Sequence, residues 1–128
     1  MTGVIVVSHG GAGPAMVEAV ERLTGRLDVH VVEVGFGEPR GEVQGRLEQA
    51  VATVGAAEVL FLVDLEGSTP FNLCCKHCEG GGVVLGGVNL PMLCKLATAD
   101  RSHSARALAE ELQATGVKSI HIRGGECK

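Results

Sequence analysis

Residues 4–14, VIVVSHGGAGP, decide the fold, because an apolar run ends at His9 and a glycine-rich turn follows at once. A short, solidly apolar run is typical of a strand that is buried on both faces of a parallel sheet. The turn and the periodic apolar residues from Met16 onward predict that a helix comes next. His9 is then placed at the carboxyl end of a strand, the edge at which open α/β sheets bind their ligands. A histidine there can act as a nucleophile, a proton carrier or a metal ligand.

The same alternation of short apolar runs and helical patterns continues along the chain. Apolar runs occur at Val4–Val7, Val29–Val34, Val59–Val63 and Val83–Leu85. Apolar residues recur with helical spacing from Met16 to Leu27, from Val43 to Val54 and from Ala105 to Leu112. Strands that alternate with helices predict an α/β fold, a three-layer sandwich in which a mostly parallel sheet carries helices on both faces.

A last, weaker run, Ser119–Ile122, alternates apolar and polar residues, unlike the four runs before it. This pattern favours a strand at the edge of the sheet or a strand that pairs at a subunit interface. A frayed C-terminal tail is the alternative.

The composition fits one domain, residues 1–128, with a core of aliphatic side chains. Hydrophobic residues make up 45% of the 128-residue chain, while Trp and Tyr are absent and Phe occurs three times. The 19 glycines exceed the average share of about 7% and indicate many tight strand–helix junctions. The formal net charge of −4 argues against nucleic acid as a partner.

Nothing in the sequence predicts a membrane span or export. No apolar run approaches the roughly 20 residues that cross a bilayer, and the amino terminus lacks the charged segment of a signal peptide. The five cysteines are an odd number, and Cys74, Cys75 and Cys78 crowd together, which is not a disulfide framework. We therefore expect a cytoplasmic protein.

A second polar group follows the third predicted strand, where LEGSTPFN comes directly after Asp64. Thr69 and Pro70 predict a helix start, with Thr69 as the N-cap residue. The free amides of this helix start, with the hydroxyls of Ser68 and Thr69, are then expected at the same sheet edge as His9. A carboxylate that accepts the N–H of one imidazole nitrogen fixes the tautomer and leaves the lone pair of the other nitrogen free to attack, which favours transient phosphorylation of the histidine. Amides and hydroxyls would spread the charge of the phosphoryl group.

Each of these residues also has a purely structural interpretation. An Asp at a strand end is more often a turn or cap residue, Ser-Thr-Pro is a common helix start, and a His at a strand end is often a hydrogen-bonded loop residue. It is their combination that favours a site.

A third junction follows the fourth predicted strand at residues 86–93, GGVNLPML, where Pro91 lies near a helix start. Asn89 either donates to a bound phosphate or holds the loop through an Asx-type turn. The sequence leaves both roles open.

Residues 5–10 (IVVSHG), 64–72 (DLEGSTPFN) and 87–93 (GVNLPML) together resemble the enzyme IIA domain of the mannose family of the bacterial sugar phosphotransferase system. The likeness covers nearly the whole chain, with the three motifs in the family's order and spacing. It implies a parallel sheet flanked by helices and a homodimer formed by exchange of a C-terminal strand, which Ile120–Arg123 would supply.

The resemblance also implies a function. In that family, a histidine at the end of the first strand accepts a phosphoryl group from phospho-HPr and passes it to a histidine of an enzyme IIB (EIIB) domain. His9 matches this histidine, Asp64 matches the aspartate that orients it, and Thr69 matches a hydroxyl position of the second motif. The residues expected to contact the phosphoryl group are Gly10, Ser68, Thr69 and Asn89. Contact with a membrane would be indirect, through the IIC and IID (EIIC/EIID) partners.

Two positions depart from the family pattern. Glu66 stands where the family usually carries Phe or Trp, and Ser68 replaces the second glycine of the turn. A carboxylate close to a phosphohistidine is mildly repulsive, and the change removes an apolar contact for docking proteins. A regulatory or binding-only relative is therefore the alternative function.

The C-x-x-C motif of Cys75 and Cys78 raises a metal or redox site as a competing interpretation. No second Cys/His pair follows at metal-finger spacing, and these cysteines share one helical face with Phe71 and Cys74. We therefore predict that the cysteines pack in the core and that the chain holds no metal and no cofactor.

Dinucleotide binding is a further competing interpretation. Gly11 and Gly13 follow a strand, and Glu33 lies about 20 residues further on, as in the dinucleotide fingerprint. Met16, however, takes the position of the third glycine, and the fingerprint leaves His9 unexplained.

Overall fold

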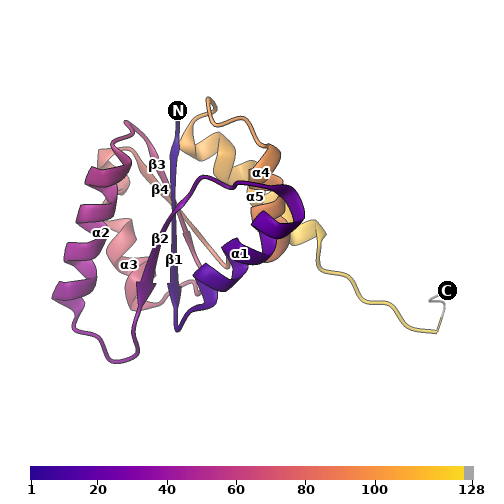
Figure 1. Cartoon of the computed structure of the whole chain (residues 1–128), viewed down its shortest axis with the longest axis horizontal. Coiled ribbons are helices and arrows are strands. Elements are labelled where there is room, and N and C mark those ends of the chain that lie inside the picture. The colour runs from indigo at the N-terminus through magenta and orange to yellow at the C-terminus, as the bar shows by residue number, and fades with distance from the viewer. Residues whose placement is uncertain (126–128) are drawn as a thin grey trace.

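The computed structural model describes residues 1–125, in which a parallel sheet lies between two layers of helices (Figure 1). The strands are β1 (Gly3–His9), β2 (His30–Val34), β3 (Val59–Val63) and β4 (Gly82–Gly86). The helices are α1 (Ala12–Thr24), α2 (Arg40–Val54), α3 (Thr69–Cys75), α4 (Leu90–Thr98) and α5 (Ala105–Lys118), with a short 3-10 helix, η1, at Cys78–Gly80. The predicted α/β fold with helices on both faces of a parallel sheet is confirmed.

The strand order is β2-β1-β3-β4, so β1 has a neighbour on each side. His9 at the end of β1 is in register with Val34 of β2, and Val7 is in register with Val63 of β3. Every pairing is parallel. The carboxyl ends of these three strands therefore meet at one edge of the sheet.

Alternate side chains of each central strand pack into two separate hydrophobic cores, one on each face of the sheet. In β1, Val4 and Val6 pack with α1, α4 and α5, whereas Ile5 and Val7 pack with α2 and α3. Figure 1 shows the same division, with α2 and α3 on one side of the sheet and α1, α4 and α5 on the other. The strands read as unbroken apolar runs because helices cover both of their faces.

Helix α1 approaches β1 closely because Gly13 has no side chain. The Oγ atom of Ser8, which is fully buried, accepts a hydrogen bond from the Gly13 N–H at 2.7 Å. Gly11, the N-cap residue of α1, offers no side chain, so Ser8 satisfies one of the first free amides of the helix from the neighbouring strand. A Cβ atom on Gly13 would lie 2.4 Å from this Oγ atom.

The expected edge strand at the C-terminus is not formed within this chain. Helix α5 continues to Lys118, and the Ser119 N–H still donates to the Thr115 carbonyl at 3.1 Å. The segment that follows has no regular structure and leads away from the body of the protein (Figure 1). Ile120 and Ile122 are 76% and 98% exposed, so the apolar side chains of this alternating segment are not buried within a single chain.

None of the helices formed by residues 1–125 has both the length and the apolar composition that a bilayer-crossing helix requires.

Replacing Gly13 with Ala is expected to lower the free energy of unfolding by about 1–3 kcal/mol, the usual cost of overpacking. The added methyl group would meet Ser8 where its hydroxyl is hydrogen bonded. The matched control is Gly45→Ala in α2, where a Cβ atom meets nothing within 4 Å. Because Ala has the better helix propensity, this variant should raise the free energy of unfolding by about 0.5–1 kcal/mol. Urea denaturation measures both effects, and equal stabilities of the two variants would contradict the close approach of α1 to β1.

Candidate active site

His9 and Asp64 lie side by side at the carboxyl edge of the sheet. His9 is the last residue of β1, and Asp64 directly follows β3. The hydrogen-bond ladder between these strands continues one step further, since the Asp64 N–H donates to the Val7 carbonyl at 3.1 Å. The structure thus brings together the two residues that the sequence singles out as histidine and orienting carboxylate.

The Asp64 carboxylate holds His9 at two points. Its Oδ1 atom lies 3.0 Å from the ring nitrogen Nδ1, and its Oδ2 atom accepts the His9 backbone N–H at 2.9 Å. Both side chains are largely buried, with 24% and 18% of their surface exposed. A carboxylate only accepts hydrogen bonds, so the facing Nδ1 carries the ring proton and the lone pair stays on Nε2.

A cavity of about 340 Å³ opens beside His9. Its walls come from the end of β2, the loop between β2 and α2, and the start of α3. The lining residues that matter for the site are His9, Val34, Phe36, Arg40, Thr69 and Pro70. The imidazole therefore borders a space with apolar, hydroxyl and cationic groups around it, and the Glu38 carboxylate also lines this space.

Phe36 covers the turn that follows His9. Its ring stacks on the imidazole, with the ring centroids 6.4 Å apart and the ring planes at 25°. Gly10 has a φ of 53°, and a Cβ atom on it would come within 2.8 Å of the Phe36 ring. The Gly10 N–H donates to the Val34 carbonyl at 3.3 Å, so this glycine shapes the turn and its amide is already engaged.

Two side chains hold the loop that forms the cavity wall. The Glu38 carboxylate accepts the Gly35 N–H at 2.8 Å and pairs with the Arg46 guanidinium through both of its oxygens. Arg46 also donates to the Glu33 carbonyl at 2.7 Å. The Arg46 guanidinium, followed by the Gly35 amide, lowers the pKa of Glu38 to about 2. The sequence does not predict this ion pair, because no motif or periodicity links a loop residue to the second turn of the next helix.

Ser68, and not Thr69, is the N-cap residue of α3. The Ser68 backbone is extended, and its Oγ atom accepts the Phe71 N–H at 3.3 Å and donates to the Leu65 carbonyl at 2.7 Å. The predicted cap was therefore wrong by one residue. Thr69 is the first residue of the helix and lines the cavity beside Pro70. With Ser68 committed to the cap, Thr69 supplies the hydroxyl on this wall.

Asn89 caps α4 and is not among the residues that line the cavity beside His9. Its Oδ1 atom accepts the Met92 N–H at 3.1 Å. Its amide nitrogen lies against Gly116 of α5, 3.2 Å from where a Cβ atom on that glycine would stand. Asn89 therefore has the structural role considered from the sequence, on the α5 side of the sheet.

Glu66 is exposed in the turn between β3 and α3 and also does not line the cavity. Its Cβ atom lies 2.8 Å from where a Cβ atom on Gly86 would stand, so the turn packs on the end of β4. Strand β4 is two strand spacings from β1, or about 10 Å. The turn that carries Glu66 thus lies on the β4 side of Asp64, away from His9.

The prediction that the cysteines pack in the core is right for Cys74 and wrong for Cys75 and Cys78. Cys74 is fully buried, and burial raises the pKa of its thiol to about 12. Cys75 and Cys78 are exposed, because α3 ends at Cys75 and the helical face predicted from the spacing does not continue to Cys78. Within residues 1–125, no three His, Cys, Asp or Glu side chains come together in a way that would hold a metal ion.

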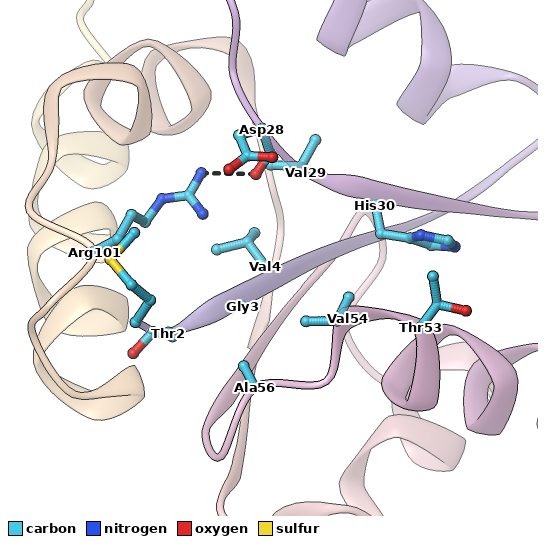
Figure 2. Close-up of a pocket in the computed structure, with 11 residues that line it drawn as sticks. Thr2, Gly3, Val4, Asp28, Val29, His30, Thr53, Val54, Ala56 and Arg101 are labelled. Carbon is cyan, nitrogen blue, oxygen red and sulfur yellow. Dashed lines mark hydrogen bonds between the residues drawn. The ribbon is translucent and has the colours of Figure 1, made fainter.

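A second cavity, of about 370 Å³, lies at the opposite edge of the sheet (Figure 2). Arg101 borders it, and its Nη2 atom donates to the carbonyls of Leu27 and Asp28 at 2.7 and 3.1 Å. This guanidinium ties the segment between α4 and α5 to the entry of β2. Since α/β folds place their ligands at the carboxyl edge, we assign the candidate active site to the cavity beside His9.

Comparison with known proteins assigns the chain to a family. A family model described as "PTS system fructose IIA component" matches residues 3–113. The chain therefore belongs to the mannose-type enzyme IIA family of the bacterial sugar phosphotransferase system, whose members are phosphotransferase proteins. The resemblance drawn from the three sequence motifs is confirmed.

Individual relatives are similar along most of their length. The chain is 29% identical over 118 residues to the sorbose-specific EIIA component of Klebsiella pneumoniae, covering 89% of this chain and 86% of the relative. It is 28% identical over 127 residues to the fructose-specific EIIA component of Bacillus subtilis, covering 95% and 86%. Its fold matches that of the mannose/sorbose specific IIA subunit from Enterococcus faecalis with a TM-score of 0.88 at 23% identity, over 99% of this chain and 98% of that one.

The pair formed by Glu38 and Arg46 should make stability depend on pH in a defined window. The folded-state pKa of Glu38, about 2, lies below its ordinary value of 4.5, so its contribution is complete above pH 4.5 and is lost as the pH falls toward 2. We expect Glu38→Gln to lower the free energy of unfolding at neutral pH, and the difference from the wild type to shrink over that window. Urea titrations at several pH values measure it. Glu48→Gln, on the exposed side of α2, is the control, and a Glu38→Gln difference that stays constant down to pH 2 would contradict the pairing.

Proposed function

We propose that the chain is a phosphoryl carrier, in which Nε2 of His9 accepts a phosphoryl group from phospho-HPr and passes it to a histidine of an enzyme IIB protein. The observation that carries this proposal is the 3.0 Å contact between Nδ1 of His9 and the Asp64 carboxylate, which leaves Nε2 as the nucleophile. Membership of the enzyme IIA family supports the same chemistry.

The proposed reaction moves a phosphoryl group between two imidazole nitrogens. The N–P bond of the donor breaks as a bond forms between phosphorus and Nε2 of His9, so the His9 ring gains positive charge while Nδ1 keeps its proton. The Asp64 carboxylate, which accepts the Nδ1–H hydrogen bond, stabilises that charge. Attack by the acceptor histidine on phosphorus then breaks the bond between phosphorus and Nε2 of His9 and restores the neutral His9 ring.

Thr69 and Arg40 are the groups that we propose for the phosphoryl oxygens. Both line the cavity beside His9, where the Thr69 hydroxyl can donate a hydrogen bond and the Arg40 guanidinium supplies positive charge. The three other residues expected to contact phosphate do not line this cavity, and each has a polar atom hydrogen bonded within the protein, which in the Asn89 side chain is the acceptor Oδ1 alone. These residues are Gly10, Ser68 and Asn89.

Phe36 and Leu65 are the apolar contacts that we propose for the two partner proteins. They are 85% and 60% exposed and belong to the two loops that follow β2 and β3 at the carboxyl edge. Phe36 thereby offers an aromatic surface close to His9, whereas the family usually carries an aromatic residue at the position of Glu66.

Incubation with phosphoenolpyruvate, enzyme I and HPr should phosphorylate the chain, and His9→Ala should abolish the labelling. Asp64→Asn should keep the fold and slow transfer on the order of 10²-fold or more, because an amide can donate to Nδ1 and favour the wrong tautomer. The rate of label uptake from phospho-HPr measures both effects.

Asp28→Asn is the matched control for Asp64→Asn. It removes a carboxylate at the opposite edge of the sheet, and Asn tolerates the positive φ of 57° at this position. This variant should take up label at the wild-type rate. Undiminished labelling of His9→Ala would contradict the proposal, and a wild-type chain that binds HPr without accepting phosphate would favour the binding-only alternative.

We also propose that two copies form a homodimer by exchanging the segment Ile120–Arg123. Strands β2 and β4 are the edges of the sheet, and each leaves a side open for one more strand. Pairing there with the partner's segment would give Ile120 and Ile122 the burial that they lack in the single chain.

Replacing Ile120 and Ile122 together with Ser should convert the dimer into a monomer. Each buried isoleucine contributes about 1.5–3 kcal/mol, so the loss should shift the equilibrium by orders of magnitude. Sedimentation equilibrium measures the mass, and Val117→Ser, which changes another exposed apolar residue on α5, is the control that should stay dimeric. A wild-type chain that sediments as a monomer would contradict the exchange.

A further inference from the structure

Cys75 and Cys78 lie at the two ends of a tight turn. The residues between them have φ and ψ of −64° and −20° at Lys76 and −89° and −2° at His77, the values of a type I turn. The first and fourth Cα atoms of such a turn lie less than about 7 Å apart, and disulfides join Cα atoms about 4.4–6.8 Å apart. The backbone therefore places the two cysteines within disulfide range.

The turn is anchored to the core by the residue in its middle. The His77 ring packs on the fully buried Phe61, with the ring centroids 5.4 Å apart. The His77 carbonyl accepts the N–H groups of Gly80 and Gly82 at 3.1 and 3.0 Å. A Cβ atom on Gly82 would lie 2.7 Å from this oxygen, so the backbone at Gly82 packs closely against the backbone of the turn at His77. The separation of the two cysteines is thus set by packed structure.

Both thiols face solvent. Cys75 and Cys78 are exposed, whereas Cys74 is buried and Cys94 is half-buried. Partial burial, followed by the neighbouring Cys78 thiol, raises the pKa of the Cys75 thiol. Cys75 therefore stays protonated longer than an ordinary cysteine, and the first attack on an oxidant falls to Cys78.

We propose that Cys75 and Cys78 are a dithiol that exchanges with low-molecular-weight disulfides and closes into an intramolecular disulfide. The turn geometry and the exposure of both cysteines support this exchange, which is independent of the phosphoryl transfer assigned to His9.

The exchange takes two steps. The Cys78 thiolate, its proton released to solvent, attacks one sulfur of a small disulfide RSSR, which forms a mixed disulfide and expels RS⁻. The Cys75 thiolate then attacks the Cys78 sulfur, which forms the Cys75–Cys78 bond and expels a second RS⁻. The two protons lost by the cysteines end on two molecules of RSH. The protein pair is oxidised by two electrons, and the small disulfide is reduced by two.

Oxidised glutathione added to the reduced full-length chain tests the proposal. After acid quenching, we expect the chain to have lost two free thiols and the mass of two hydrogen atoms, with no glutathione attached. Trypsin cuts after Lys76, between the two cysteines, so the disulfide should keep the two flanking peptides joined until a reductant separates them.

Serine variants identify the sulfurs. Cys75→Ser should retain one glutathione on Cys78, because the thiol that resolves the mixed disulfide is missing, and Cys78→Ser should form no intramolecular bond. Cys94→Ser and Cys127→Ser are the controls and should close the disulfide as the wild type does. A wild-type chain that keeps both thiols or carries only glutathione adducts, or a disulfide that survives Cys75→Ser, would overturn the proposal.

Discussion

The contact between the Asp64 carboxylate and His9 is the interaction on which the site depends. One oxygen fixes the His9 backbone N–H and the other fixes Nδ1, so the same group sets the position of the residue and the tautomer of its ring. This double contact requires β1 and β3 to be neighbours with their ends aligned, as the pairing of Val7 with Val63 ensures. The buried apolar strands thus do more than form a core, because their register delivers the two polar side chains to one point.

The strands and the meeting of His9 with Asp64 followed from the sequence for a physical reason. A strand covered by helices on both faces must be apolar throughout, which leaves an unbroken run such as Val59–Val63 that is easy to recognise. Parallel strands also end at a common edge, so the residues just beyond two such runs are expected to be close. Figure 1 shows the helices that cover both faces of the sheet.

The features that the sequence did not predict depend on the residue at which a helix begins or ends, or on side-chain contacts that follow no repeating sequence pattern. Ser68 and Thr69 are both good N-cap residues, and only the extended backbone of Ser68 decides between them. The exposure of Cys78 was missed because a helical spacing argument assumes that the helix continues, whereas α3 ends at Cys75. The ion pair of Glu38 and Arg46 joins a loop to a helix, which no sequence pattern indicates. The alternating apolar and polar residues of the C-terminal segment indicate that it can form a strand, but they do not indicate which strand it pairs with.

The position of the proton on the His9 imidazole tests the role of Asp64 most directly. Long-range proton–nitrogen NMR correlation in a chain labelled with nitrogen-15 histidine distinguishes the two tautomers of the neutral ring. We expect the proton on Nδ1 and a bare Nε2, with this preference weakened in Asp64→Asn. A neutral His9 that carries its proton on Nε2 in the wild type would contradict the assignment of Nε2 as the phosphoryl acceptor.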